Sequence, residues 1–113
     1  MDFDSLSDVK FGDLDGLDEM LFANFVQHKT FREVFYSRGI QVPAYPLANA
    51  DPANLDDWLL AHQVEHQAFA SLLGLTNPFN ILDDAWDKEE EFYNWLALHL
   101  TIHEQIAKEL GLT

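Results

Sequence analysis

The chain has 113 residues and no cysteine, and its 20 acidic residues against 6 basic ones give a formal net charge of −14. This length is typical of one compact domain. The absence of cysteine excludes a disulfide framework, a thiolate metal site and a cysteine nucleophile. With so few basic residues we expect no direct nucleic-acid partner, and without an apolar run of ~20 residues we expect no membrane insertion.

Residues 1–14 are acidic and carry apolar side chains at intervals. This pattern is typical of an arm that becomes ordered on a protein partner, and the alternative is a frayed acidic tail. It does not have the pattern of a secretory signal. We therefore divide the chain into an acidic N-terminal arm, residues 1–14, and a helical bundle domain, residues 15–113. The apolar side chains of the arm that we expect to contact a partner are Phe3, Leu6, Val9 and Phe11.

Three segments with helical periodicity follow the arm: residues 15–38, 52–73 and 88–110. Each is followed by a glycine, which favours the left-handed conformation at a helix C-terminus. Asp51 before Pro52 predicts the start of the second helix, and Asp87 with Glu90 predicts a capping box at the start of the third. No strand alternation is present. The sequence therefore predicts an all-α protein, a small three-helix bundle with extended proline-containing linkers.

The second and third predicted helices resemble each other. Residues 58–75 and residues 95–112 align at an offset of 37, which superimposes a tryptophan and two histidines of each segment. The first helix joins this alignment less closely, at an offset of 38, which places Asn24 and His28 on the two histidine positions. A period of this size is typical of helical repeats. We therefore predict an internal helix repeat of about 37 residues.

Each predicted helix carries a stripe of side chains spaced by alternating steps of four and three residues, which is the face that packs against partner helices. The outer positions of every stripe are apolar, and the two central positions are polar. The midpoints meet whichever way the helices run, so we expect one polar layer in the middle of the bundle. Its members are Asn24, His28, His62, His66, His99 and His103.

Two interpretations of this polar layer compete. We favour a structural layer that fixes helix register at some cost in stability and needs no cofactor. The alternative is a metal-binding bundle with redox or hydrolytic chemistry, because histidines at i and i+4 share one helix face and imidazole binds ions such as zinc or iron. Its ligands would be His28, His62, His66, His99 and His103. No carboxylate lies on a stripe, since Glu65 and Glu104 are beside it, and this weakens the metal hypothesis.

The remaining sequence carries no catalytic pattern. No serine stands in a nucleophile elbow, and no glycine-rich phosphate loop is present, so we predict no catalytic residue. Surplus aromatic residues Phe22 and Phe25 on the first helix, and Tyr45 in the first linker, are candidate contacts with a protein partner or a second copy of the chain. Trp58 and Trp95 are expected to fill the core. An acidic mimic of nucleic acid is a further alternative that depends on charge alone.

The segments Phe22-x-Asn24-x3-His28-x2-Phe31, WLLAHQVEH and FYNWLALHLTIHEQIAKELGL resemble short proteins of unknown function encoded in tailed-phage genomes. The resemblance covers residues 17–112. It implies a non-catalytic structural or interaction protein, a small virion or assembly component that binds larger virion proteins. It also implies a location in the host cytoplasm, in the virion, or in both.

Overall fold

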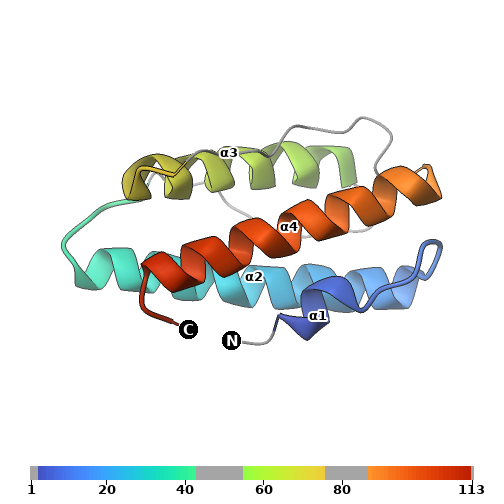
Figure 1. Cartoon of the computed structure of the whole chain (residues 1–113), viewed down its shortest axis with the longest axis horizontal. Helices are drawn as coiled ribbons and strands as arrows, with labels where there is room; N and C mark the ends of the chain where they lie inside the picture. The colour runs from blue at the N-terminus through green and yellow to red at the C-terminus, as the bar shows by residue number, and fades with distance from the viewer. Residues whose placement is uncertain (1–2, 43–54, 76–86, 113) are drawn as a thin grey trace.

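A computed structural model describes residues 3–42, 55–75 and 87–112, and within these ranges the chain is helical and contains no strand (Figure 1). The helices are α1 (Asp4–Ser7), α2 (Leu14–Ser37), α3 (Leu55–Leu73) and α4 (Glu89–Glu109). The predicted all-α class is confirmed. The three long helices correspond to the three predicted segments, and the short α1 was not expected. None of the described helices is long and apolar enough to cross a bilayer.

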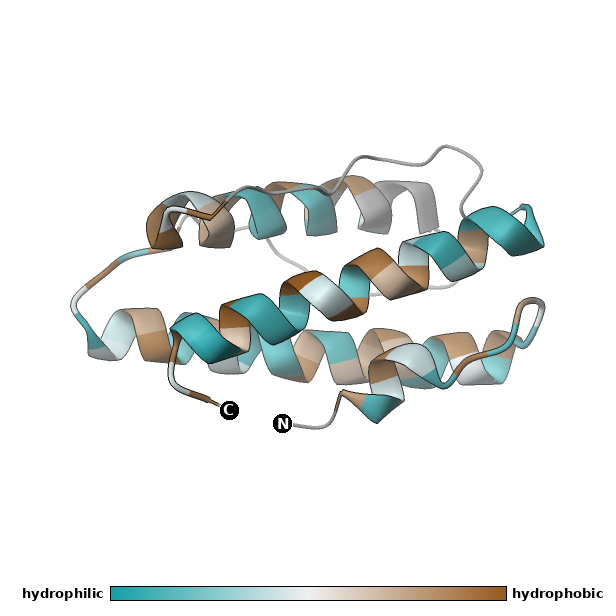
Figure 2. Ribbon diagram, in the orientation of Figure 1, coloured by the Kyte–Doolittle hydropathy of each residue, from teal (hydrophilic) through white to brown (hydrophobic). Residues whose placement is uncertain are grey.

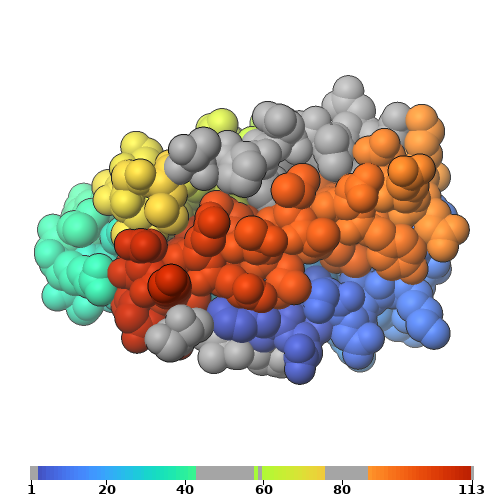
Figure 3. All heavy atoms as spheres, viewed as in Figure 1, coloured from blue at the N-terminus to red at the C-terminus, as the bar shows by residue number. Residues whose placement is uncertain are grey.

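The molecule extends over 40 × 24 × 23 Å along its three principal axes. The three long helices all run in the same direction along the longest of these axes (Figure 1). In Figure 1 the N-terminal end of each long helix lies at the right and its C-terminal end at the left. Figure 3 shows α4 crossing the front face of the bundle, with α1 packed below it. Because the helices are parallel, side chains at equivalent positions along the three stripes meet at the same height.

The ends of the helices follow local rules in part. The side chain of Asp13 caps α2 by accepting a hydrogen bond from the backbone N–H of Gly16 at 3.1 Å. Gly39, which follows α2, has a φ of +76°, the left-handed conformation predicted for it. The predicted capping box at Asp87 is wrong, because α4 begins at Glu89 after Lys88, which makes no side-chain cap bond. The predicted cap at residues 51–52 lies outside the described residues.

The predicted stripes form the core. Figure 2 shows hydrophobic and hydrophilic segments alternating along each long helix, as expected for helices with one face turned inward. The six stripe positions of α2 are all buried: Leu17, Leu21, Asn24, His28, Phe31 and Phe35. So are the six of the last stripe, on α4 and at its C-cap: Phe92, Leu96, His99, His103, Ile106 and Leu110. On α3, His62, His66 and Phe69 are buried and Leu73 is half-buried, whereas the side chains of Leu55 and Leu59 lie outside the described set. The polar centres of the α2 and α4 stripes are therefore enclosed between apolar layers, and on α3 the buried Phe69 follows the two histidines.

The N-terminal segment is folded onto the bundle. Helix α1 contacts α2 and α4, Leu6 is fully buried, and Val9 is 5% exposed. The backbone N–H of Phe11 donates to the Tyr93 hydroxyl at 3.1 Å. The expectation that Leu6 and Val9 contact a partner is therefore corrected, because burying these apolar side chains within the chain already removes them from water.

Candidate metal site in the bundle core

All six polar residues of the predicted layer meet in the centre of the bundle, and each is at most 2% exposed. Helix α2 contributes Asn24 and His28, and α3 and α4 contribute two histidines each. They form two levels, each with one side chain from every long helix. The three-histidine layer consists of His28, His66 and His103, and the asparagine layer consists of Asn24, His62 and His99.

The three-histidine layer is an equilateral triangle of ring nitrogens. The Nε2 atoms of His28, His66 and His103 lie 3.1 Å from one another along all three sides. In the asparagine layer, Asn24 Oδ1 lies 3.1 Å from His62 Nε2 and 2.8 Å from His99 Nε2, and these two nitrogens are 3.1 Å apart. A 2.8 Å contact between the Nε2 atoms of His62 and His66 joins the two layers. The side chains therefore direct ligand-type atoms at one small volume.

Two of the rings are held from outside by hydrogen bonds at Nδ1. His28 Nδ1 donates to the carboxylate of Glu65 at 2.8 Å, and His103 Nδ1 donates to Gln27 Oε1 at 3.0 Å. A neutral imidazole carries one N–H. The bond at Nδ1 therefore leaves an unprotonated lone pair on each Nε2, facing inward. Metal-bound histidines are oriented in the same way by an acceptor at the second ring nitrogen.

The inward contacts outnumber the protons that could bridge them. Seven contacts of 2.8–3.1 Å join the five Nε2 atoms and Asn24 Oδ1. His28 and His103 supply no inward proton, and each of the other three histidines supplies at most one. Most of these contacts therefore bring lone pairs together, which is unfavourable unless a positive charge lies between them.

Added protons are a poor source of that charge. Burial lowers the pKa of His62, His66, His99 and His103 well below the ordinary value, and the neighbouring histidines lower each pKa further. The pKa of His28 is also lowered by burial, although the hydrogen bond and the charge of Glu65 oppose this. The five rings are accordingly neutral near pH 7 and available as ligands.

The distances between the inward-facing Nε2 atoms fit a transition-metal ion. Such an ion holds imidazole nitrogens at about 2.0–2.1 Å, so two ligands at right angles lie about 3.0 Å apart and two at the tetrahedral angle about 3.4 Å apart. The ligand atoms of the five histidines all lie within 4.8 Å of one another. The set lacks an inward carboxylate, which makes it unsuited to calcium or magnesium. Imidazole nitrogen suits zinc, copper, iron and nickel.

Glu65 is a buried carboxylate that sequence reasoning placed beside the site and gave no role. It is 2% exposed, and it accepts hydrogen bonds from His28 Nδ1 and from the Arg32 guanidinium. Burial alone would raise the pKa of Glu65, but the bonds from His28 and Arg32 hold it below its ordinary value. Glu65 is therefore ionised, and it fixes the orientation of His28 while Arg32 balances its charge.

Gln27, Arg32 and Glu65 were missed because each lies off the stripe that defines the core face. A weak signal was present, since Gln27 directly precedes His28 and Glu65 directly precedes His66. Arg32 lies one helical turn after His28. Side chains next to a buried histidine along a helix can reach the Nδ1 atom of a ring on a neighbouring helix, and two of these three do so.

Aromatic rings close both ends of the cluster. Trp58 stacks on His62 and Trp95 stacks on His99, each with ring centroids 4.5 Å apart. At the other end, the ring centroids of Phe69 and His28 are 5.4 Å apart, and those of Phe31 and His103 are 5.5 Å apart. Both tryptophans fill the core, as expected. The apolar lids exclude water, and charge interactions inside the cluster are correspondingly strong.

The predicted partner-binding residues that the structure describes differ in exposure. Phe22 is 68% exposed on α2. Phe3, Phe11 and Phe25 are half-buried against the core, and Tyr45 lies outside the described residues. Among the aromatic side chains of this set within residues 3–42, Phe22 is therefore exposed and the other three are partly covered by the core.

No family model matches the chain, and neither the curated proteins nor the solved structures contain a significant match to it.

Proposed function

We propose that the protein binds a divalent first-row transition-metal ion in the centre of its helical bundle. The observation that carries this proposal is the convergence of five imidazole Nε2 atoms with too few protons to bridge them. A cation between the two layers would turn repulsion among lone pairs into coordination. Glu65 and Gln27, at the outer nitrogens, hold two of the rings in the required tautomer.

The ligand set favours zinc, cobalt, nickel, iron or copper. Its donors are neutral imidazoles and one amide oxygen, Asn24 Oδ1. The ionised carboxylate of Glu65 would not touch the ion, because it binds the outer nitrogen of His28. Hard cations prefer oxygen ligands, whereas intermediate cations prefer nitrogen. We expect tight binding of Zn²⁺ or Ni²⁺ and negligible binding of Mg²⁺ or Ca²⁺.

The ion would act mainly as a structural centre. Each long helix supplies ligands, so coordination would link helices that packing and a few side-chain hydrogen bonds already join. The binding free energy would then become folding free energy. The ligands are at most 2% exposed. Hydrolysis needs an open position for water and substrate, which this degree of burial opposes.

A metal titration tests the proposal. Tag-free protein freed of metal by chelator is titrated with Zn²⁺ or Ni²⁺ in a calorimeter, and we expect one ion per chain. His66→Ala should weaken binding by at least about a hundredfold, because His66 Nε2 contacts three other histidines. Gln67→Ala, an exposed change on the same helix, is the matched control. Absence of binding by the wild-type protein would refute the proposal.

A second proposal concerns a protein partner. We propose that the exposed face of α2 contacts a larger protein, in line with the resemblance to small phage virion or assembly proteins. Phe22 and Val26 support this, because they lie one turn apart and are 68% and 44% exposed. Apolar side chains in such positions are stabilised when a partner covers them. Light scattering and pull-down with Phe22→Asp test it. Unchanged partner capture and an unchanged oligomeric state would contradict it.

We also propose that the three long helices derive from one repeated unit of about 37 residues. The pairing of equivalent positions supports this, since histidines of α3 and α4 whose Nε2 atoms are in contact lie 37 residues apart, and those of α2 and α3 lie 38 apart. If the units are equivalent, exchanging the corresponding side chains Phe69 and Ile106 between α3 and α4 should preserve the fold. A loss of cooperative unfolding in the exchanged variant would count against equivalence.

A further inference from the structure

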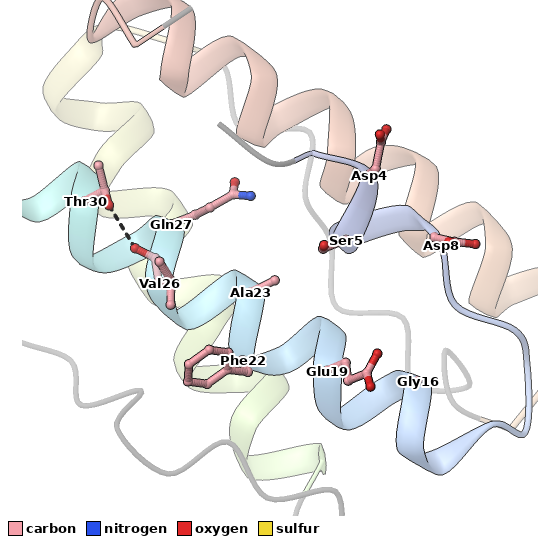
Figure 4. A pocket seen from close by; sticks show the side chains of 10 residues that line it. All are labelled: Asp4, Ser5, Asp8, Gly16, Glu19, Phe22, Ala23, Val26, Gln27 and Thr30. Atoms are coloured by element: carbon pink, nitrogen blue, oxygen red, sulfur yellow. Dashed lines mark hydrogen bonds between the residues drawn. The ribbon is translucent and has the colours of Figure 1, made fainter.

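A groove lies between α1 and α2, lined by side chains of α2 from Gly16 to Thr30 (Figure 4). Its volume is about 580 Å³, and its polar lining includes the carboxylates of Asp4, Asp8 and Glu19. Among the residues that the structure describes, no lysine or arginine lines it. All three acidic residues are exposed, so the groove presents a negative wall to solvent.

Gln27 connects this groove to the cluster. It lines the groove, is 4% exposed, and accepts the hydrogen bond from His103 Nδ1. The Nε2 atom of the same His103 ring belongs to the three-histidine layer. One amide side chain and one imidazole ring therefore span the distance from the groove to the inward-facing nitrogens.

The other boundaries of the cluster are less favourable to a cation. Both ends are covered by aromatic rings, from Trp58 and Trp95 at one end and from Phe31 and Phe69 at the other. On the side of His28 the cluster is bounded by Glu65 and by Arg32, whose side chain is 17% exposed. The charges of Arg32 and Glu65 cancel in an ion pair at that boundary, so it offers no net negative charge to attract a cation.

We propose that metal ions enter and leave the core through this groove, with Gln27 as the side chain that must move aside. This inference rests on the proposed metal-binding function. The three carboxylates raise the local concentration of cations at the mouth of the groove and increase the association rate. The neutral amide of Gln27 then offers an oxygen to a cation that has begun to lose water.

The test compares metal-loading rates of two variants with the same change in charge. The groove variant carries Asp4→Asn, Asp8→Asn and Glu19→Gln. The control variant carries Glu89→Gln, Glu90→Gln and Glu109→Gln, at exposed positions of α4 that do not line the groove. Loading of chelator-treated protein with Ni²⁺ is followed by stopped-flow tryptophan fluorescence at low and at high salt.

We expect the groove variant to load at least about threefold more slowly than the control variant at low salt, and the difference to vanish at high salt because screening removes steering. The final stoichiometry and affinity of both variants should match the wild type. Equal loading rates for the two variants would overturn the route while leaving the metal site intact. Faster loading by Arg32→Gln, with no effect of the groove changes, would place the entrance on the opposite side. A wild-type protein that takes up no Ni²⁺ at equilibrium would instead refute the proposed function itself.

Discussion

The Nε2 atoms of His28 and His103 face each other at 3.1 Å, although the Nδ1 atom of each ring already donates a hydrogen bond outward, to Glu65 and to Gln27. Neither neutral ring has a proton left for the other. The pair therefore holds two lone pairs together in a site sealed from water. This arrangement is the strongest reason to regard the cluster as a set of metal ligands rather than as a hydrogen-bonded polar layer.

Exchanging the amide of Asn24 for a carboxylate should increase metal affinity. Asn24 Oδ1 lies 2.8 Å from His99 Nε2, in the same layer as this ligand nitrogen. A charged oxygen at this position attracts a divalent ion more strongly than an amide oxygen does. We expect Asn24→Asp to bind Zn²⁺ about tenfold more tightly in a competition titration with a chromophoric chelator. Asn94→Asp makes the same change at an exposed position of α4 and should leave the affinity unchanged. Weaker binding by Asn24→Asp would show that this oxygen does not face the ion.

The same variant should be less stable when no metal is present. A buried carboxylate without a cation costs about 3 kcal/mol or more, and Asn24 is fully buried. Urea unfolding of metal-free Asn24→Asp is therefore expected to show a lower midpoint than the wild type, and added Zn²⁺ should reverse the order. If the two proteins unfold at the same midpoint without metal, Asn24 is more accessible to water than its burial indicates.

Removing the charge of Glu65 should weaken the site without removing a ligand. Glu65→Gln keeps the size of the side chain but replaces the carboxylate that accepts the hydrogen bond from His28 Nδ1–H with an amide. Such outer partners of ligating histidines contribute about 10–100-fold to metal affinity. Calorimetric titration should show a loss in this range at unchanged stoichiometry. The control is Glu104→Gln, which removes an exposed charge. An equal effect of both variants would mean that only net charge matters.

Acidification should destabilise the metal-free protein. The folded-state pKa of all five histidines lies below the ordinary value because of burial, so the unfolded chain binds more protons than the folded chain. The free energy of unfolding therefore falls as the pH drops below about 6.5, by up to about 1.4 kcal/mol per pH unit for each histidine. The Glu65 carboxylate, with its pKa lowered, loses its contribution only at more acidic pH, and Arg32 stays charged.

Thermal unfolding of the chelator-treated protein between pH 7.5 and 5 checks this expectation. The melting temperature should fall steadily as the pH is lowered over this range. A histidine cluster that is open to water would titrate at its ordinary pKa in both states and leave the melting temperature unchanged. That result would contradict the enclosed site.

A bound paramagnetic ion should quench tryptophan fluorescence. Trp58 and Trp95 stack on His62 and His99 with ring centroids 4.5 Å apart, so an ion held by these rings lies within a few ångströms of both indoles. In a Trp86→Phe background, Ni²⁺ or Cu²⁺ should quench most of the emission at one equivalent, whereas Zn²⁺ should not. Emission that declines only with many equivalents of Ni²⁺ would point to binding on the acidic surface instead.

The position of the cluster could be predicted from the sequence because it depends on the stripe pattern alone. The spacing of Asn24 and His28, repeated by two histidine pairs, placed all six side chains at the middle of the core face. The parallel direction of the helices could not be predicted, since linkers of this length allow either direction. Only the parallel arrangement brings Asn24, His62 and His99 into one layer and His28, His66 and His103 into the other.

The outer supports of the site could not be predicted for a different reason. Gln27 and Glu65 lie beside the stripe, where polar side chains are usually solvated, and only the packing of a neighbouring helix buries them. The burial of Leu6 was missed because a helix as short as Asp4–Ser7 leaves almost no periodicity in the sequence. Both errors concern contacts between segments far apart in the chain.

The most direct test of the metal centre is elemental analysis of tag-free protein purified without added metal or chelator. We predict close to one divalent first-row transition-metal ion per chain in the wild-type protein, and only background levels in His66→Ala and His103→Ala. Wild-type protein that contains no such metal, and whose melting temperature does not rise on addition of zinc, nickel, copper or iron, would contradict the account and leave the histidines as a polar layer of the core.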